Sequence, residues 1–144
     1  MDSSNLGWNT LEDERKTEGM TSIDVPVMTL DKFFEGKYLP NIDFIKIDVE
    51  GSEWRVLSGM HKTLERLNPK PILVIEVTWG ESHPHWQEEV DQFEWLISNG
   101  YQRTNYHVTQ TQDVLFIPEV YYIPNSNNPN EKILDPSLGI KLFQ

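Results

Sequence analysis

The chain has 144 residues, of which 38% are hydrophobic, and this is enough apolar material for one folded domain. A net charge of −11 without any run of Lys or Arg argues against a nucleic-acid partner, and the absence of cysteine excludes disulfides, thiolate metal sites and a cysteine nucleophile. No apolar run is long enough to span a membrane, and the first ten residues lack the basic and apolar regions of a signal peptide, so a cytoplasmic protein is expected.

The amino-terminal part of the chain predicts little regular structure. Residues 1–22 are polar and have no clear period, so we expect a lead-in that is mostly loop. The apolar and β-branched segment SIDVPVMTL, residues 22–30, predicts a strand, and its Pro26 favours an edge position because proline cannot donate to a ladder. A short helix over residues 31–36 follows, with Asp31 as its expected cap.

The middle of the chain alternates strand and helix patterns. Residues 41–51, NIDFIKIDVEG, predict a strand, and residues 52–67 predict one helix because their apolar residues recur at helical spacing. Residues 71–77, PILVIEV, form a near-continuous apolar run, which is typical of a strand buried on both faces of a parallel sheet.

The last predicted elements are a second helix and two strands. Residues 85–100 carry an amphipathic helix pattern that ends at Gly100, a favourable residue for the position after a helix. Residues 101–110 and 113–119 predict two strands that are close enough to form a hairpin. Residues 119–144 are rich in proline and asparagine, so a tail without a further element is expected.

Strands and helices alternate through residues 23–118, and this order predicts an α/β domain with a mainly parallel sheet and helices on both of its faces. Ligands of such sheets bind outside the carboxyl ends of the strands. The rule points to residues 48–53 and 76–85, where two central strands are expected to end.

Charged residues occupy every second position at one predicted strand end, in FIKIDVEGSEWRVL, residues 44–57. On a strand, Lys46, Asp48 and Glu50 point to one side, roughly 7 Å apart at each step of two residues. Together with Glu76 from the neighbouring strand they predict a carboxylate cluster at the mouth of the sheet, in which Lys46 pairs with Asp48.

Two interpretations of this cluster are open on the residues alone. In the first, Lys46 and Asp48 only neutralise each other, while Glu50 and Glu53 are capping groups of the following helix. In the second, the carboxylates line a ligand site, because perturbed carboxyl groups gather at such sites.

A second candidate lies in the loop HPHW, where His83 and His85 follow the strand that carries Glu76. An H-x-H pair with Glu76 or Glu81 nearby matches the ligand types of a divalent metal site. The same histidines could act as a base, and the alternative is an ordinary polar loop that begins a helix.

The segment VPVMTLDKFF, followed by IDFIKIDVEGSEWRVLSGM and then PILVIEV, closely resembles the FkbM family of S-adenosylmethionine-dependent methyltransferases. The family pattern combines a TLD segment with hDhhKhDhEGxExxhLxG, in which h is an apolar residue. The resemblance covers residues 5–118, and its many polar positions at fixed spacing make it specific. The matching residues are Thr29, Leu30, Asp31, Asp43, Lys46, Asp48, Glu50, Gly51, Glu53, Leu57 and Gly59.

The resemblance implies a Rossmann-like class I methyltransferase sheet with one antiparallel strand near its end. It also implies methyl transfer from S-adenosylmethionine to a hydroxyl of a small-molecule or glycan acceptor, such as a sugar or a natural product, and no metal is firmly implied. The candidate catalytic residues are Asp48, Glu50 and Lys46, with Asp48 also on the cofactor side. The candidate residues of the acceptor side are Glu53, Glu76, His83 and His85.

The chain departs from the family pattern in the cofactor half of the domain. It contains no GxG sequence for the glycine-rich turn after the first strand, and SSNLGWNTL resembles the family segment after the third strand. We therefore expect a carboxyl-terminal half that lacks the amino-terminal cofactor-binding strands, with the missing half or a second copy as partner. The alternative function is a non-catalytic remnant or a partner-dependent half-domain that does not bind the cofactor alone.

Overall fold

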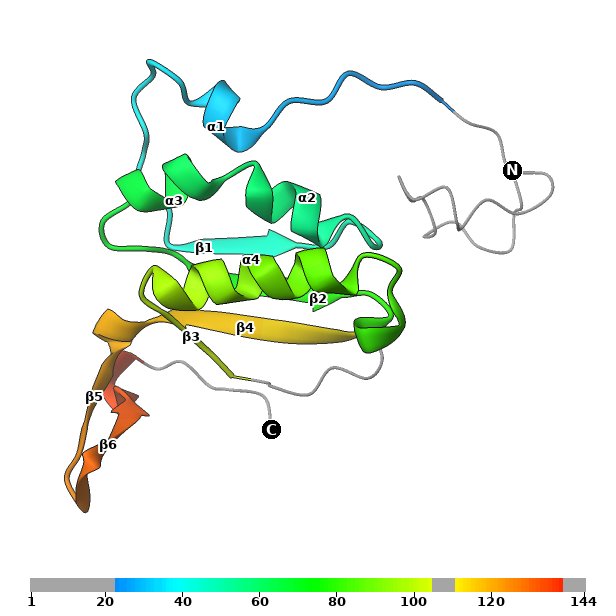
Figure 1. Cartoon of the computed structure of the whole chain (residues 1–144). Coiled ribbons are helices and arrows are strands. Elements are labelled where there is room, and N and C mark those ends of the chain that lie inside the picture. Colours follow the sequence, from blue (N-terminus) through cyan, green and yellow to red (C-terminus); the bar gives the residue numbers. More distant parts are fainter. Residues whose placement is uncertain (1–22, 105–110, 139–144) are drawn as a thin grey trace.

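The computed structural model describes residues 23–104 and 111–138. These residues form a mixed α/β architecture, with a four-stranded sheet, helices packed on it and a separate two-stranded hairpin (Figure 1). The predicted lead-in of residues 1–22 and most of the predicted strand over residues 101–110 lie outside the described residues.

The four-stranded sheet is mixed, with the strand order β1-β2-β4-β3. β1 (Phe44–Ile47) runs parallel to β2 (Ile72–Val77), whereas β4 (Gln112–Pro118) runs antiparallel to both β2 and β3 (Tyr101–Arg103). The carboxyl ends of β1 and β2 therefore lie at the same edge of the sheet as the first residues of β4. The arrangement is compatible with a methyltransferase-like fold.

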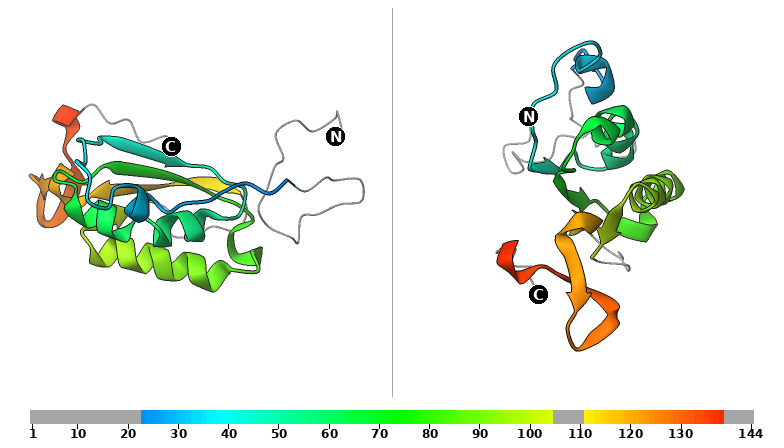
Figure 2. Two further views of the ribbon diagram at one scale, coloured as in Figure 1. Left: turned by 90° about the horizontal axis from the view of Figure 1, so that it is seen from above. Right: turned by 90° about the vertical axis from the view of Figure 1, so that its left-hand side faces the viewer.

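Three helices pack on one face of the sheet: α2 (Glu53–Ser58), α3 (His61–Arg66) and α4 (Trp86–Ser98), as the right-hand view of Figure 2 shows. Helices on both faces were expected, and for the described residues this expectation is wrong, because the connections from β1 to β2 and from β2 to β3 cross the same face. α4 matches its prediction, and Gly100 follows it with φ 88°. No helix in the described ranges has the length and apolar content needed to cross a membrane.

β2 shows how the sheet is buried. Its side chains alternate between fully buried positions on the helix-covered face and half-buried positions on the other face, so the predicted burial on both faces is wrong. Glu76 belongs to the half-buried set, which leaves its carboxylate accessible. The core consists of Ile47, Leu57, Met60, Leu64, Leu67, Leu73, Ile75, Val77, Phe93, Leu96, Tyr101, Val114 and Phe116.

The segment before the sheet does not form the predicted strand. Residues 23–29 have no regular structure, and α1 (Leu30–Phe33) is one short turn. Its N-cap is Thr29, whose Oγ1 accepts a hydrogen bond from the backbone N–H of Lys32 at 3.2 Å, so Asp31 is not the cap of this helix. A strand would need packing for its apolar side chains, and these are exposed instead at Ile23, Val25, Val27 and Met28.

The predicted helix over residues 52–67 is divided into α2 and α3 at Gly59. The carbonyl oxygen of Gly59 accepts a hydrogen bond from the backbone N–H of Asp31 at 2.9 Å, so α1 docks at the break. The carboxylate of Asp31 accepts hydrogen bonds from the backbone N–H groups of Lys62 and Thr63, at 3.1 and 2.7 Å. Asp31 therefore caps α3, at a distance of 32 residues along the chain from Thr63.

The carboxyl-terminal region contains a hairpin where a tail was expected. β5 (Tyr122–Asn125) pairs antiparallel with β6 (Asn128–Leu134), and the pair projects from the end of β4 (Figure 1). The side-chain Oδ1 of Asn125 accepts a hydrogen bond from the backbone N–H of Asn127 at 3.0 Å, which reverses the chain in an Asx turn. Short 3₁₀ turns occupy Gly80–Ser82, Glu119–Tyr121 and Pro136–Leu138.

Candidate functional site

The predicted charged cluster forms at the carboxyl ends of β1 and β2. Lys46 Nζ lies 2.9 Å from Asp48 Oδ2, which confirms the predicted pair, and 4.0 Å from Glu76 Oε2 on the neighbouring strand. The side chains of Lys46, Asp48 and Glu76 are 49%, 41% and 29% exposed. Because these side chains remain in contact with water, the free-energy cost of desolvating their charges is small, and a ligand at this edge could reach them.

A further carboxylate, which the sequence reasoning missed, joins this edge from β4. Asp113 is the direct cross-strand partner of Glu76, because β4 runs antiparallel to β2. Burial raises the pKa of Glu76 above its ordinary value, and the negative charges of Asp48, Asp113 and Glu50 raise it further, while Lys46 lowers it. Asp113 could be recognised in the sequence as an acidic residue at the start of the last predicted strand. Its position directly opposite Glu76 could not be predicted, because it depends on the register between β2 and β4.

The turn between β1 and α2 has an unusual backbone. Glu50 has φ 53°, in the left-handed region that non-glycine residues rarely occupy, and Gly51 has φ 102°. Ser52 occupies the predicted N-cap position, but its side chain makes no capping hydrogen bond. The carboxylate of Glu53 instead accepts hydrogen bonds from the backbone N–H groups of Val49 at 3.2 Å and Gly51 at 3.0 Å, which belong to the turn before α2.

Two buried glutamates stand behind this turn, one on α2 and one on α4. Glu53 is 2% exposed and Glu89 is 4% exposed. Burial raises the pKa of Glu53 above its ordinary value, although the hydrogen bonds that its carboxylate accepts act to lower it. Burial, together with the charge of Glu53, raises the pKa of Glu89 to about 8, while a hydrogen bond from the backbone of Trp54 and the charge of Arg103 oppose the rise. Glu89 was not a candidate from the sequence, since its pattern position is ordinary for an amphipathic helix.

His83 and His85 lie in an aromatic group at the start of α4. His83 is buried, its Nδ1 accepts a hydrogen bond from the backbone N–H of His85 at 3.0 Å, and its ring stacks on Trp79. The ring of His85 lies against Trp54, and its Nδ1 is 3.1 Å from an oxygen of Glu88. The two histidines therefore contact Trp54 in the first turn of α2 and Trp79 in the segment after β2 through their rings.

The described ranges contain no group of three or more His, Asp or Glu side chains arranged to hold a metal ion. The alternative of a metal site at His83 and His85, with Glu76 or Glu81, therefore finds no support in these residues. Within this loop the ring of His83 stacks on Trp79 and lies near the ring of His85, and its Nδ1 accepts a hydrogen bond from the backbone N–H of His85.

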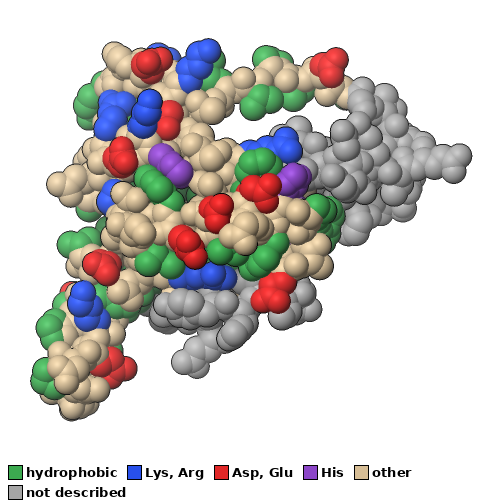
Figure 3. All heavy atoms as spheres, viewed as in Figure 1, with side chains coloured by type: hydrophobic (Ala, Val, Ile, Leu, Met, Phe, Trp, Pro, Cys, Tyr) green, Lys and Arg blue, Asp and Glu red, His purple; other side chains and the backbone are tan. Residues whose placement is uncertain are grey.

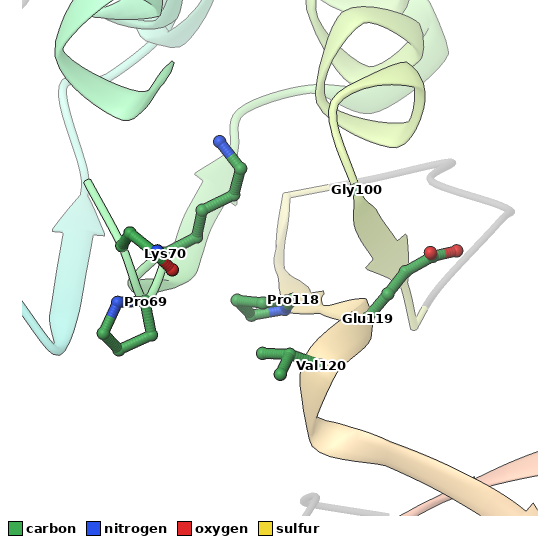
Figure 4. A pocket seen from close by; sticks show the side chains of 7 residues that line it. Pro69, Lys70, Gly100, Pro118, Glu119 and Val120 are labelled. Carbon is green, nitrogen blue, oxygen red and sulfur yellow. The ribbon is translucent and has the colours of Figure 1, made fainter. Parts of the chain in front are cut away.

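Two surface hollows lie away from the carboxylates. One, of about 230 Å³, is at the opposite end of β2 and is lined by residues that include Lys70, Pro118 and Val120 (Figure 4). The other, of about 530 Å³, lies between α1 and α3, where Figure 3 shows Lys and Arg side chains gathered on an otherwise acidic chain. Its basic lining residues are Lys32, Lys62 and Arg66.

The carboxylate edge is suited to a positively charged ligand and to proton transfer from a hydroxyl. Asp48, Glu76 and Asp113 concentrate negative charge there, and Lys46 offsets only part of it. A carboxylate with a raised pKa, such as that of Glu76, is also a better proton acceptor than an ordinary one.

Comparison with protein families gives a match over most of the chain. The family model described as the methyltransferase FkbM domain matches residues 2–103, which is more than half of the chain and includes β1, the Val49–Gly51 turn, β2 and α4. Comparison with curated proteins and with solved structures found no match.

Proposed function

The chain belongs to the family of FkbM methyltransferase domains, and from this we propose that it transfers a methyl group from S-adenosylmethionine to a hydroxyl oxygen of a sugar or a natural-product-like acceptor. The observation that supports this proposal best is the carboxylate edge, where the charged positions of the family motif meet Glu76 at the carboxyl ends of two parallel strands. Open α/β sheets bind their ligands at this edge.

Asp48 and Glu50 are the proposed catalytic residues. Either carboxylate would orient the acceptor hydroxyl and take its proton, while the methyl group would pass from the donor sulfur to the hydroxyl oxygen as the methyl–sulfur bond breaks. Lys46 would hold Asp48 in place through its 2.9 Å contact. Positioning of the acceptor oxygen in line with the methyl carbon supplies much of the rate in such transfers.

S-adenosylmethionine supplies, when bound, a methyl group activated by a positively charged sulfur. Asp48 and Glu76 are the residues here that fit the cationic end of such a donor, because their carboxylates are partly exposed and share one edge. The sequence has no GxG turn for the adenosyl end, so the proposed contacts of this chain are limited to the charged end.

A second candidate is a half-domain that needs a further polypeptide to bind the cofactor. It is favoured by β1, which has one strand neighbour in the described part of the sheet and carries Phe44 with 56% of its surface exposed. An edge strand with an exposed aromatic residue is suited to pairing with another strand.

Calorimetry with S-adenosylmethionine and transfer of a radiolabelled methyl group to a panel of saccharides test these two candidates. Micromolar binding with label on a hydroxyl oxygen supports the methyltransferase. No binding at millimolar cofactor by the folded chain contradicts it and favours the half-domain. In an active chain, Asp48→Ala should lower turnover by about 10²- to 10⁴-fold with little loss of stability, whereas Glu65→Ala on the exposed face of α3 should change neither.

A further inference from the structure

The carboxylate of Glu53 is bonded to the turn that carries the proposed catalytic residues. Its Oε1 accepts hydrogen bonds from the backbone N–H groups of Val49 and Gly51, each at 3.2 Å, and its Oε2 accepts a second one from Gly51 at 3.0 Å. These donors belong to the residues on either side of Glu50, and Val49 directly follows Asp48.

The turn requires such support because of its backbone. A glutamate with φ 53° at position 50 is held in a sparsely populated conformation, and such residues persist only where surrounding contacts determine them. Gly51 continues the turn with φ 102°. One carboxylate that binds the N–H groups on both sides of Glu50 is suited to hold this conformation.

Glu53 is placed to act on the turn and not on a ligand. It is 2% exposed, lies in the first turn of α2, and is backed by the buried Glu89 of α4. Glu89 in turn accepts a hydrogen bond from the backbone of Trp54, the next residue of α2. The two glutamates thus support consecutive segments of backbone from inside the protein, and the expected acceptor-side role of Glu53 does not fit its burial.

We propose that Glu53 is the positioning residue of the site, which holds the Val49–Gly51 turn so that Asp48 and Glu50 keep the orientation needed for methyl transfer. The inference rests on the proposed function for its effect on turnover. The effect on the turn itself is independent of that function.

Amide hydrogen exchange on the full chain tests the effect on the turn, with Glu53→Ala, Glu53→Gln and Glu65→Ala compared with the unchanged protein. A glutamine whose carbonyl oxygen takes the place of Oε1 can still accept from both Val49 and Gly51, whereas alanine cannot. We expect exchange at these two amides to accelerate about tenfold or more in Glu53→Ala, and to stay slow in Glu53→Gln and Glu65→Ala. The amides of Leu73 and Ile75 in β2, which report global opening, should stay protected in all variants.

The proposal is overturned if Glu53→Ala leaves exchange at Val49 and Gly51 unchanged, or if it accelerates the β2 amides equally. If Glu53→Ala does not fold, Glu53→Asp replaces it, because the shorter side chain keeps the charge but cannot reach both donors, and faster exchange confined to the two turn amides is again expected.

Methyl transfer to the saccharide panel then separates positioning from a direct role. We expect a lower kcat with a nearly unchanged KM in Glu53→Ala, and recovery of most of the turnover in Glu53→Gln. A glutamine variant with protected turn amides and the same low turnover as alanine would assign a direct role to the charge and overturn the proposal. If the unchanged chain transfers no methyl group, the proposed function fails, while the exchange measurement still decides whether Glu53 holds the turn.

Discussion

Asp31 lies in the first turn of α1, yet its carboxylate binds the start of α3. Oδ1 accepts hydrogen bonds from the backbone N–H and the hydroxyl of Thr63, both at 2.7 Å, and Oδ2 accepts one from the backbone N–H of Lys62. Burial raises the pKa of Asp31, but the hydrogen bonds from Thr63 and Lys62 outweigh it, so the pKa lies below the ordinary 3.8. The ionised form is therefore stabilised by folding.

Asp31→Ala should lower the free energy of unfolding by about 1–2 kcal/mol at neutral pH, because α3 loses its cap. The contribution of Asp31 is present above the unfolded pKa and is lost as the pH falls through the lower folded pKa, so the two proteins should converge in acid. Urea denaturation at neutral and acidic pH measures this difference. Asp24→Ala, at an exposed position without regular structure, is the matched control and should have little effect. A similar loss in both variants would contradict the capping role.

The backbone of Glu50 has φ 53°, a conformation that glycine adopts at a lower free-energy cost than a β-branched residue does. Substitutions at this position should therefore differ in stability. Glu50→Gly should keep the stability of the protein within about 1 kcal/mol, since relief of the left-handed strain offsets the greater flexibility of glycine. Glu50→Val should be less stable than Glu50→Gly by about 1–2 kcal/mol. Thermal unfolding of Glu50→Gly and Glu50→Val measures this difference in stability. Equal stabilities of the two variants would show that this backbone conformation is not retained in solution.

At the scale of elements, α1, α2 and α3 meet at Gly59. A Cβ atom at this position would lie 3.0 Å from both Cβ and Cγ2 of Thr29, which caps α1. The sequence pattern TLD and the later LxG therefore describe one contact, in which Thr29 packs on Gly59 while Asp31 caps α3. A side chain at Gly59 would separate α1 from the helices that pack on the sheet.

Gly59→Ala should destabilise the protein by about 1–3 kcal/mol, because the added methyl group would lie 3.0 Å from both Cβ and Cγ2 of Thr29. Thr29→Ser removes Cγ2 and keeps the hydroxyl that caps α1, so the double variant should recover part of the loss. Chemical denaturation of the two single variants and the double variant measures the coupling. Additive effects, or a loss no larger than that of Ser58→Ala at the exposed neighbour, would contradict the close contact.

At the scale of the whole molecule, the packing of α2 and α4 on one face of the sheet buries two carboxyl groups together. Glu53 and Glu89 raise each other's energy in the ionised form, and the nearby Arg103 offsets this only in part. The pKa of Glu89 is about 8 in the folded protein, against an ordinary 4.5. The packing of these helices is therefore most favourable when Glu89 carries a proton.

Stability should fall as the pH rises from 4.5 to about 8, because the folded protein holds a proton on Glu89 that the unfolded chain has released. The slope is at most about 1.4 kcal/mol per pH unit for this one group, and Glu53 adds to it in the same direction. Glu89→Gln should reduce the slope and raise the melting temperature near neutral pH. Glu94→Gln, at an exposed position on the same helix, should leave the slope unchanged. An equal slope in the unchanged protein and Glu89→Gln would refute the raised pKa.

The sequence alone was sufficient for the features that depend on neighbouring residues. It predicted β1 and β2 as parallel strands, α4 with Gly100 after it, the Lys46–Asp48 pair and the family that the matched domain model confirms. α4, Gly100 and the Lys46–Asp48 pair rest on a period, a turn residue or a contact two positions apart, which are local features. The parallel pairing of β1 and β2 follows from the order strand–helix–strand along the chain, and the family follows from polar residues at fixed spacing.

Only the tertiary structure decided the contacts between distant segments. The register of β4 places Asp113 opposite Glu76, the docking of α1 gives the carboxylate of Asp31 to α3, and the packing of α4 on α2 buries Glu53. No pattern of neighbouring residues in the sequence predicts these contacts, because each depends on which strands pair and on which face of the sheet the helices cover. The carboxylates of the motif were therefore foreseen as a group, while their division into exposed residues at the sheet edge and a buried support beneath the turn was set by the fold.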